Sequence, residues 1–361
     1  MNVDMFSNVP KFYRFKEFIK ENIIFKSKPH TKILSEKELA KKYNINITTV
    51  NKAISILVEE GYLYRIGGKG TYVAEYKKLK KMDLIGVVVP DVKEGICAQY
   101  VKGIIDYIKI KDKYNVVLYD DENDYEKQYN YINRLLNGKV HGLIIVPLPN
   151  NKNDSSLIKD IIKKNVKLVF LDRYTAEFNT NYVVSDNLKG MYELTKYLIE
   201  WGHRRIGFIL TSLKNKTVIE RLEGYKLAFK DSGVKIDENL IVESEYFDSK
   251  AGKVESEKLI KNFKVTAIIG VNDLVSLGVV NKCSELGIKI PDELSIGSYD
   301  DLDFAEYLPV PLTTVHQPGY EMGKKAAEII VGLIENKLKE PQRIKIPSFL
   351  IKRDSCAPVR E

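Results

Sequence analysis

The sequence of 361 residues predicts two domains: a small domain of helices with a β-hairpin, and a large α/β domain of two doubly wound subdomains. Three observations support this fold class. Residues 35–74 change from helical periodicity to strand-like alternation around a glycine-rich turn. From residue 84 onward, apolar strand-like runs alternate with amphipathic helical stretches. Charge is uneven, because residues 1–82 carry seventeen Lys or Arg against eight Asp or Glu, a net charge of +9, whereas the remainder carries −1.

Two short helices are expected on either side of Asn44 in the small domain. Ser35 is a suitable N-cap for the first, because Glu38 three residues later completes a capping box. Asn44 ends that helix, and a second helix begins near Asn46 with apolar residues at a spacing of 3.6. A tight turn between two such helices is typical of a helix-turn-helix, whose second helix can enter the major groove of DNA. An earlier amphipathic helix, after Pro10, is expected to pack beneath the pair.

A β-hairpin is predicted next, since YLYRI and TYVA alternate on either side of the tip GGKG. Glycines allow a backbone to approach another surface closely, and Arg65 and Lys69 would face phosphates if that surface were DNA. The alternative is an ordinary turn, because short motifs are often coincidental. The helix pair beside it favours a DNA-contacting wing. GGKG is not a phosphate-binding P-loop, since Gly70 follows Lys69 where Ser or Thr is required.

Residues 10–75 contain SEKELAKKYNI, TTV, EGYLYR and GKGTYV in that order, and they resemble the winged helix-turn-helix of GntR-family transcription regulators. The resemblance implies DNA contacts from the start of the first motif helix, from the recognition helix and from the wing tip. Those positions are here Lys37, Asn46, Thr48, Thr49, Asn51, Gly67, Gly68 and Lys69, and the hairpin adds Arg65. Such a basic head on a neutral body is also the charge distribution expected of a nucleic-acid-binding protein.

The recognition helix departs from the family pattern at two positions. Many members carry arginine where this chain has Ile47 and Asn51. Arginine most often reads guanine, whereas Asn suits adenine and Ile suits the thymine methyl group. We therefore predict an operator half-site that is richer in A·T pairs than is usual in the family.

The large domain is predicted to begin at residue 83, after a charged linker at residues 76–82. Strands are expected in LIGVVV, NVVLY, GLIIVPL, VKLVFLD, RIGFIL, LIVESEYF, TAIIGV and LSIGSY. Helices are expected at residues 95–111, 124–136, 155–164, 187–200, 218–231, 250–262 and 273–285. Continuous runs of Val, Ile and Leu indicate strands buried on both faces, so the sheets should be mainly parallel, with ligands at their carboxyl ends. No GxGxxG follows these strands, which argues against a dinucleotide-binding fold.

Several segments resemble the effector-binding domain of LacI/GalR-family regulators: VSDNLKGMYELTKYLIEWGHRRIGFI, ERLEGYKLAF, AIIGVNDLVSLGVV, GIKIPDELSIGSYDDLDFAEYLPVPLTTVHQP and EMGKKAAEII. The resemblance implies the fold of periplasmic sugar-binding proteins, in which two subdomains are joined by three crossover strands around a small ligand. On that basis, subdomain 1 comprises residues 83–182 and 314–339, and subdomain 2 comprises residues 183–313 and 340–361. A GntR-type head on a LacI-type body is the arrangement of the arabinose-type repressors.

Polar residues that directly follow the predicted strands are candidates for a small-molecule site: Asp91, Asp172, Arg173, Asn272, Asp300 and Gln317. Carboxylates accept hydrogen bonds from hydroxyls and a guanidinium donates to them, which suits a neutral polyhydroxylated ligand. The resemblance implies effector contacts at Arg221, Asn272, Asp300 and Gln317, and further contacts at Asp172 and Phe247, where the Phe ring would cover the apolar face of a sugar.

Competing structural interpretations exist for several of these positions. Glu220 could hold Arg221 in a surface ion pair. Asp273 and Asp301 are interpreted as helix N-caps or turn residues. His203 is interpreted as a side chain that satisfies backbone groups.

Cys97, Cys283 and Cys356 lack metal-site spacing, so they are predicted to be reduced thiols of a cytosolic protein. Cys97 stands where relatives of the body often carry an aromatic contact, which weakens any inherited sugar specificity. The four histidines form no HxxxH pair, so neither a metal site nor a cofactor is expected. No secretory signal or membrane-spanning run is present.

These features together predict a cytoplasmic, homodimeric transcription regulator, a repressor of carbohydrate-utilisation genes that is released by a small sugar such as L-arabinose. A regulator that responds to a purine or a sugar phosphate is the alternative. An enzyme on the same α/β body is disfavoured, because nucleophile-elbow, metal and phosphate-loop motifs are absent from the sequence. A solute-binding protein would need a secretory signal and has no use for a basic helix-turn-helix.

Overall fold

The computed structural model describes residues 10–75, 82–93, 95–148, 154–174, 179–211, 216–246, 248–339 and 341–359. The chain divides into two compact units, Met1–Lys81 and Met82–Glu361, and each is described by itself. Most of the predicted linker at residues 76–82 lies outside the described residues.

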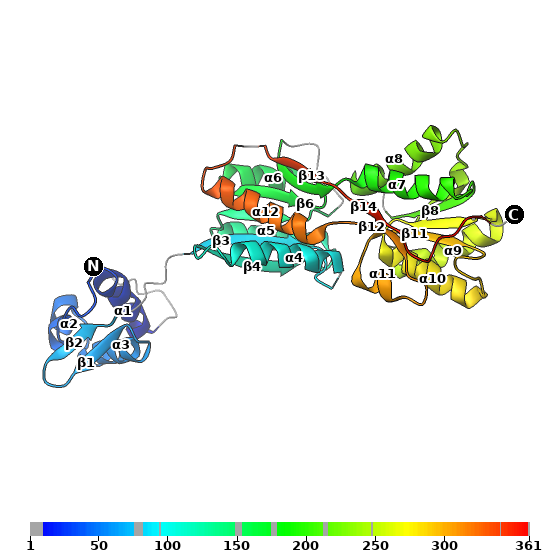
Figure 1. Cartoon of the computed structure of the whole chain (residues 1–361). Helices are drawn as coiled ribbons and strands as arrows, with labels where there is room; N and C mark the ends of the chain where they lie inside the picture. Colours follow the sequence, from blue (N-terminus) through cyan, green and yellow to red (C-terminus); the bar gives the residue numbers. More distant parts are fainter. Residues whose placement is uncertain are drawn as a thin grey trace. The chain divides into compact units, whose positions relative to one another are not determined.

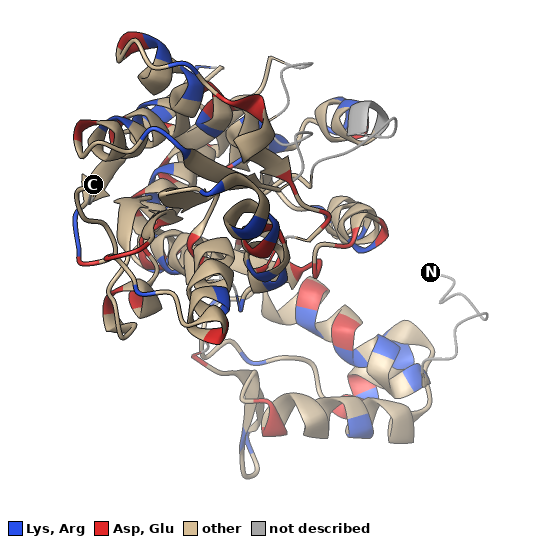
Figure 2. Ribbon diagram, turned by 90° about the vertical axis from the view of Figure 1, so that its right-hand side faces the viewer, with Lys and Arg blue, Asp and Glu red and all other residues tan. Residues whose placement is uncertain are grey.

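The N-terminal unit consists of helices and a β-hairpin (Figure 1), with Lys and Arg spread along both (Figure 2). Its elements are α1 (Lys11–Ile19), a π-helical turn (Lys20–Ile24), α2 (Glu36–Tyr43), α3 (Ile47–Glu59), β1 (Leu63–Ile66) and β2 (Gly70–Val73). The predicted capping box is present, since Ser35 Oγ accepts from Glu38 N and Ser35 N donates to Glu38 Oε2 at 2.8 Å. Asn44 ends α2 with a φ of 53°, and Asn46 caps α3, so the predicted helix pair is confirmed.

One apolar core holds this unit together. It buries side chains from α1, α2, α3 and both strands, including Phe15, Ile19, Leu39, Ile54, Leu57, Leu63 and Val73. The strands are antiparallel with Leu63 opposite Val73, so these two side chains lie on the same face of the hairpin and point into the core. The hairpin is therefore anchored at its base, and its glycine-rich turn at residues 67–70 is exposed.

The larger unit contains two lobes, each built on its own sheet (Figure 1). Lobe 1 has the strand order β13-β7-β6-β5-β3-β4. Its strands are β3 (Asp83–Val89), β4 (Tyr114–Asp120), β5 (Gly142–Ile145), β6 (Lys167–Leu171), β7 (Asn181–Ser185) and β13 (Arg343–Ile346), and all of them pair in parallel. Its helices are α4 (Gly95–Ile108), α5 (Tyr125–Asn137), α6 (Asp154–Lys163) and α12 (Gly319–Ile334).

Both faces of the lobe 1 sheet are covered, as the continuous apolar strands predict. Val87 and Val89 pack with residues of α4 and α12, whereas Val88 between them packs with residues of α5 and α6. Helices α4 and α12 approach closely at glycines. A Cβ atom on Gly103 would lie 2.1 Å from the carbonyl oxygen of Tyr320, and the same holds for Gly323 and Tyr100. This close packing brings the start of α12 next to α4.

Lobe 2 has the strand order β14-β12-β11-β10-β8-β9, with β14 antiparallel to β12 and the other pairs parallel. Its strands are β8 (Ile206–Leu210), β9 (Ile241–Glu243), β10 (Ala267–Gly270), β11 (Ser295–Asp300), β12 (Thr313–His316) and β14 (Phe349–Ile351). Its helices are α7 (Asn187–Glu200), α8 (Lys216–Asp231), a 3-10 turn (Glu238–Leu240), α9 (Ser249–Phe263), α10 (Asp273–Leu286) and α11 (Asp303–Tyr307).

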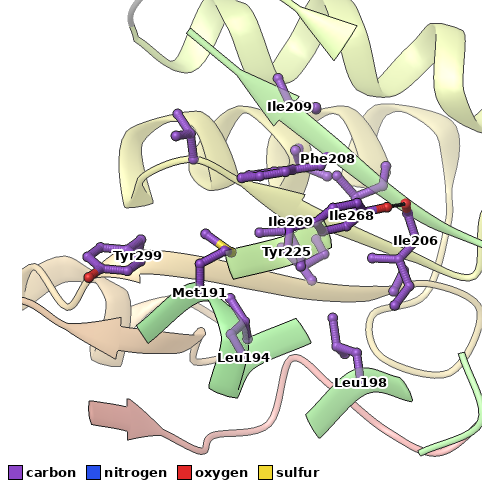
Figure 3. Packing of buried hydrophobic residues seen from close by; sticks show 14 of the residues in the cluster. Met191, Leu194, Leu198, Ile206, Phe208, Ile209, Tyr225, Ile268, Ile269 and Tyr299 are labelled. Atoms are coloured by element: carbon purple, nitrogen blue, oxygen red, sulfur yellow. Dashed lines mark hydrogen bonds between the residues drawn. The ribbon is translucent and has the colours of Figure 1, made fainter. Parts of the chain in front are cut away.

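The core of lobe 2 joins its helices to both faces of the sheet (Figure 3). Phe208 and Ile268 from neighbouring strands are fully buried, and Leu194 of α7 packs in the same cluster. Tyr225 of α8 is also buried there, and its hydroxyl donates to the carbonyl of Ile206 at 2.8 Å. That bond satisfies the polar end of an otherwise apolar side chain.

In the described part of the chain, the backbone passes between the lobes after β7, after β12 and between β13 and β14. The subdomain limits predicted from the sequence differ from this pairing. Strand β12 belongs to lobe 2, whereas the sequence predicts residues 314–339 in subdomain 1. Strand β13 joins lobe 1, whereas the sequence predicts residues 340–361 in subdomain 2. Strand β7 extends lobe 1 to Ser185. These strands are short, and long-range pairing decides which sheet they join, so local sequence does not locate the crossovers.

Candidate DNA-binding and effector sites

The predicted DNA-contacting residues of α2 and α3 lie at the surface of the N-terminal unit. Lys37 and Asn51 are exposed, and Thr49 is half-buried. Asn46 and Thr48 are exposed and also shape the start of α3, because Asn46 Oδ1 accepts from Thr48 N at 2.8 Å and from Thr48 Oγ1 at 2.7 Å. These two residues therefore position the first turn of α3.

The hairpin tip presents Gly67, Gly68 and Lys69 to solvent. Arg65 is placed differently, because its Nη2 lies 3.2 Å from Glu36 Oε1 and thus pairs β1 with α2. An exposed pair of this kind contributes up to about 1 kcal/mol. The structure therefore gives Arg65 a partner inside its own domain.

The effector residues predicted in the larger unit are brought together in part. Asp172 follows β6, Asp300 ends β11, Gln317 follows β12, and Arg221 projects from α8. Tyr100 of α4 joins them, and all five are at most 9% exposed. We call Tyr100, Asp172, Arg221, Asp300 and Gln317 the junction cluster, because lobe 1, lobe 2 and a crossover segment each contribute to it.

Gln317 uses every hydrogen-bonding position of its side-chain amide. Its Nε2 donates to Tyr100 Oη at 2.5 Å and to Asp172 Oδ1 at 3.0 Å. Its Oε1 accepts from Arg221 Nη2 at 2.8 Å and from Ser185 Oγ at 3.1 Å. Since an amide offers two donor and two acceptor positions, Gln317 is satisfied within the protein and bridges the lobes.

Arg221 is buried and held from several directions. Its Nε donates to Asn187 Oδ1 at 2.9 Å, and its Nη1 donates to the carbonyl of Val271 at 2.6 Å. Its Nη2 lies 3.5 Å from Asp300 Oδ1, and the guanidinium carbon lies 3.6 Å from the centre of the Tyr299 ring. The alternative of a surface ion pair with the neighbouring Glu220 is therefore wrong, because the guanidinium points into the interior.

Three aspartates in and beside the junction cluster have backbone φ angles that are positive. The φ angles are 65° at Asp172, 112° at Asp300 and 59° at Asp301. Non-glycine residues adopt such angles at a cost of about 1–3 kcal/mol, and such strain gathers at functional sites.

Asp301 is held differently from Asp300, and it serves as a structural turn residue. Its Oδ1 accepts from Arg353 Nη2 at 2.7 Å, and its Oδ2 lies 2.9 Å from His316 Nδ1. Burial by itself would raise the pKa of Asp301, but the hydrogen bonds from His316 and Arg353 outweigh it and lower the pKa. This agrees with the interpretation of Asp301 as a turn residue rather than a ligand.

Sequence reasoning missed Tyr100, Ser185 and Asn187. Burial, together with the charge of Asp172, raises the pKa of Tyr100 well above its usual value, so its phenol stays protonated. Ser185 and Asn187 lie in the quoted VSDNLKG segment, which was a usable signal. Tyr100 has no comparable signal, because its hydroxyl reaches the cluster from the middle of an apolar helix.

Asp91 and Asn272 bind their own loops rather than the junction cluster. Asp91 Oδ1 accepts from the backbone N of Lys93 at 2.8 Å. Asn272 Oδ1 accepts from the backbone N of Val275 at 2.8 Å and so caps α10. Arg173 lies beside the cluster, with its Nε 3.4 Å from Asp172 Oδ2. Phe247 lies outside the described residues.

The predicted role of Asp273 as a helix N-cap or turn residue needs correction. It is the first residue of α10 rather than its N-cap, which is Asn272. Its fully buried carboxylate accepts from Leu302 N at 2.7 Å and from Thr314 Oγ1 at 2.8 Å, and also from Ser298 Oγ. Burial raises the pKa of Asp273 to about 6 despite these bonds. The residue thus ties α10 to the ends of lobe 2 strands, a long-range role that an N-cap pattern does not reveal.

His203 satisfies neighbouring groups, as predicted: its Nε2 lies 3.0 Å from the carbonyl of Ala357 and its Nδ1 lies 2.9 Å from Thr266 Oγ1. Cys97, Cys283 and Cys356 are buried free thiols. Within the described ranges, no group of three His, Cys, Asp or Glu residues could hold a metal ion. Across the same ranges, no helix is both long and apolar enough to span a membrane.

Comparison with known proteins assigns both units. Residues 15–73 match the bacterial regulatory proteins of the gntR family, and residues 195–356 match the periplasmic binding protein-like domain. The arabinose metabolism transcriptional repressor of Halalkalibacterium halodurans is 30% identical over 344 residues, which cover 91% of this chain and 89% of that protein. The chain belongs to the GntR-type transcription regulators that carry a periplasmic binding protein-like domain.

Two further relatives match most of this chain, and one of them is a LacI family regulator. The ribose operon repressor of Haemophilus influenzae is 30% identical over 285 residues, covering 78% of this chain and 84% of that protein. A LacI family transcriptional regulator from Enterococcus faecium, solved with bound ribose, aligns with a TM-score of 0.69 at 25% identity, covering 77% of this chain and all of that one. The predicted fold class and the predicted role as a DNA-binding transcription regulator are confirmed.

Proposed function

We propose that this protein is a cytoplasmic, homodimeric repressor of carbohydrate-utilisation genes that leaves its operator when a small neutral sugar binds at the junction cluster. The meeting of Asp172, Arg221 and Asp300 from opposite lobes in one buried cluster carries the proposal. Carboxylates accept from hydroxyl groups and the guanidinium donates to them, so a polyol can replace the bonds that now join the lobes. Relatives named as repressors of arabinose metabolism and of the ribose operon make pentoses the first ligands to test.

The charge balance of the cluster favours an uncharged ligand over a sugar phosphate. Arg221 already directs its N–H groups to Asn187, Val271 and Gln317. Asp300 lies beside Arg221, and Asp172 bonds to the same Gln317 amide, so both add negative charge to the cluster. Arg173, the other cation beside the cluster, is paired with Asp172 at 3.4 Å. A phosphate needs cations that are free to pair with it, and repulsion from two carboxylates opposes its binding. A purine remains the second candidate, because it can also be neutral.

The DNA half of the proposal rests on the N-terminal unit. Thr49 and Asn51 of α3 read base edges in the major groove, while the tip at residues 67–69 contacts the phosphate backbone. A homodimer presents two copies of α3 to two half-sites related by two-fold symmetry. Selecting bound sequences from a random pool tests the expected preference for A·T pairs, and recovery of G·C at the Asn51 position would overturn it.

Effector binding and operator binding are coupled in this proposal. The sugar bonds to groups of both lobes, so it stabilises one arrangement of the lobes over another, and that arrangement binds the operator less tightly. Because coupling free energies are reciprocal, the operator must weaken sugar binding by the same factor.

Thermal unfolding with a ligand panel tests the sensing half of the proposal. The panel contains L-arabinose, D-ribose, D-ribose 5-phosphate and hypoxanthine, and a ligand that binds the folded state raises the unfolding midpoint. A response to a free pentose, followed by operator release with that pentose, supports the proposal. A response confined to the phosphate or the purine replaces the effector class and leaves the regulator in place.

A further inference from the structure

Glu220 precedes Arg221 on α8, and it connects the two lobes at a second point beside the junction cluster. The residue is 4% exposed. Its Oε1 accepts from Tyr174 Oη at 3.2 Å and from Lys345 Nζ at 3.3 Å. Tyr174 follows β6 and Lys345 lies in β13, so both donors belong to lobe 1 while the carboxylate belongs to lobe 2.

The second carboxylate oxygen of Glu220 is unpartnered in the described part of the chain. Oε2 is buried and has no hydrogen-bond partner among the residues that the structure describes. Most buried polar atoms are hydrogen-bonded, and an exception calls for an explanation such as a bound ligand. An ion pair with Lys345 that served only the structure would use Oε1. It would not explain why Oε2 is buried without a donor among the described residues.

The lobe 1 side of this contact carries a buried donor that is ion-paired but not hydrogen-bonded among the described residues. Arg173 Nε is buried and, among the described residues, forms no hydrogen bond, although it lies 3.4 Å from Asp172 Oδ2. Arg173 directly precedes Tyr174, whose hydroxyl bonds Glu220. An acceptor on lobe 2 and a donor on lobe 1 therefore flank the same interlobe contact. A sugar hydroxyl can supply the donor that Oε2 of Glu220 lacks, since a hydroxyl donates one hydrogen bond.

We propose that Glu220 is a further effector-recognising residue, whose Oε2 accepts a hydrogen bond from one ring hydroxyl of the sugar while Oε1 remains bonded to Tyr174 and Lys345. This inference rests on the proposed function and deepens it, because it makes Glu220 a determinant of which sugar binds. The same side chain then senses the ligand with one oxygen and ties the lobes together with the other. Burial and the charge of Glu220 raise the pKa of Tyr174 to about 12, so the phenol remains a donor to Oε1.

The experiment measures the affinity of L-arabinose, D-ribose and their monodeoxy analogues by calorimetry. It compares the wild-type protein with Glu220→Gln and with Glu223→Gln, which changes an exposed carboxylate on the same helix. Loss of a hydrogen bond to a charged group weakens binding by about 10- to 100-fold. We expect the wild-type protein to show this loss for the deoxy analogue that lacks the hydroxyl bound by Glu220, in addition to any analogue whose missing hydroxyl is bound by Asp172, Arg221 or Asp300. Glu220→Gln should bind the parent sugar more weakly by a similar factor and distinguish it poorly from that analogue, whereas Glu223→Gln should match the wild type.

Tyr174→Phe separates recognition from lobe closure. It removes a donor to Oε1 and leaves Oε2 in place, so it should weaken all sugars by a common factor and preserve the discrimination against the deoxy analogue. Glu220→Asp repeats the comparison with a retained charge and a shorter reach, should Glu220→Gln fail to fold. Unchanged discrimination in the Glu220 variants overturns the inference while the sugar-responsive function stands. Failure of the wild-type protein to bind any sugar of the panel overturns both.

Discussion

Arg221 of α8 donates a hydrogen bond from Nη2 to Oε1 of Gln317 at 2.8 Å, at the point where the chain leaves β12 of lobe 2 for α12 of lobe 1. The other side of the same amide faces lobe 1, through Tyr100 and Asp172. The Gln317 side chain thus links helix α8 of lobe 2 to helix α4 and the segment after β6 of lobe 1. A ligand that binds Arg221 competes with this link, so the contact that senses the ligand is also a contact that sets the lobe arrangement.

Gln317→Glu should destabilise the larger unit. The substitution removes both Nε2 donors and places a carboxylate beside Asp172, so like charges meet in a buried cluster. We expect the free energy of unfolding in urea to fall by about 2–4 kcal/mol. Gln342→Glu makes the same change in formal charge at a partly exposed position and should cost much less. Equal losses in the two variants would show that Gln317 does not depend on its buried partners.

Asp300→Asn should remove the response to the sugar and leave operator binding intact. Asparagine tolerates the φ of 112° at this position better than most residues, so the backbone should survive while the charge that faces Arg221 is lost. We expect sugar affinity to fall about 10- to 100-fold. The shift in unfolding midpoint with L-arabinose is the readout, and Asp303→Asn, at an exposed residue nearby, is the control. Loss of operator binding instead would identify Asp300 as a structural carboxylate.

Replacing Thr49 and Asn51 together by alanine should weaken operator binding and leave the response to the sugar intact. Both lie on α3, which the proposal places in the major groove, so operator affinity should fall at least about tenfold, since each good base contact contributes about 1–3 kcal/mol. The thermal response to the sugar should be unchanged. Glu59→Gln, at the exposed end of the same helix, controls for a change in surface charge. Undiminished operator affinity in the double variant would remove α3 from the interface.

Lys69→Ala should weaken operator binding nearly equally for all DNA sequences. Lys69 is exposed at the hairpin tip, where a lysine contacts phosphates and reads no base. The slope of log affinity against log salt should become smaller in magnitude by about 1. Arg65→Ala should alter this slope less, because Arg65 is paired with Glu36. An equal change of slope in the two variants would place Arg65 on the DNA as well.

Local patterns in the sequence predict most of the elements but not the whole site. Ser35, Glu38 and Asn44 fix the limits of α2 through contacts within a few residues, so their roles could be derived from spacing alone. Glu220 and Tyr100 could not be identified in this way. Each lies on a helix, and each acts through partners more than forty residues away that only the folded lobes bring close.

Asp121 provides a test of buried charge in lobe 1. It follows β4 and is fully buried, its Oδ2 accepts from Gln128 Nε2 at 2.6 Å, and its Oδ1 accepts from Asn123 N at 3.1 Å. Burial raises the pKa of Asp121 to about 7, against an ordinary value of 3.8. Between these values the folded protein retains a proton that the unfolded chain has released, so stability falls as the pH rises. The stabilisation that the folded protein gains from keeping Asp121 protonated is fully present below the pKa of the unfolded chain. It is lost as the pH rises through the pKa of the folded protein.

Asp121→Asn should therefore flatten the pH dependence of stability, since an amide has no proton to release in this range. The slope that Asp121 contributes reaches about 1.4 kcal/mol per pH unit, and urea unfolding at about pH 5 and about pH 8 measures it. The free energy of unfolding should fall more between these two values in the wild-type protein than in the variant, even though the amide fits the two donors less well and lowers stability overall. Asp112→Asn, at an exposed position of the same lobe, should keep the wild-type profile. Parallel profiles for the wild type and Asp121→Asn would mean that the folded protein holds Asp121 ionised, with Gln128 and Asn123 compensating its burial.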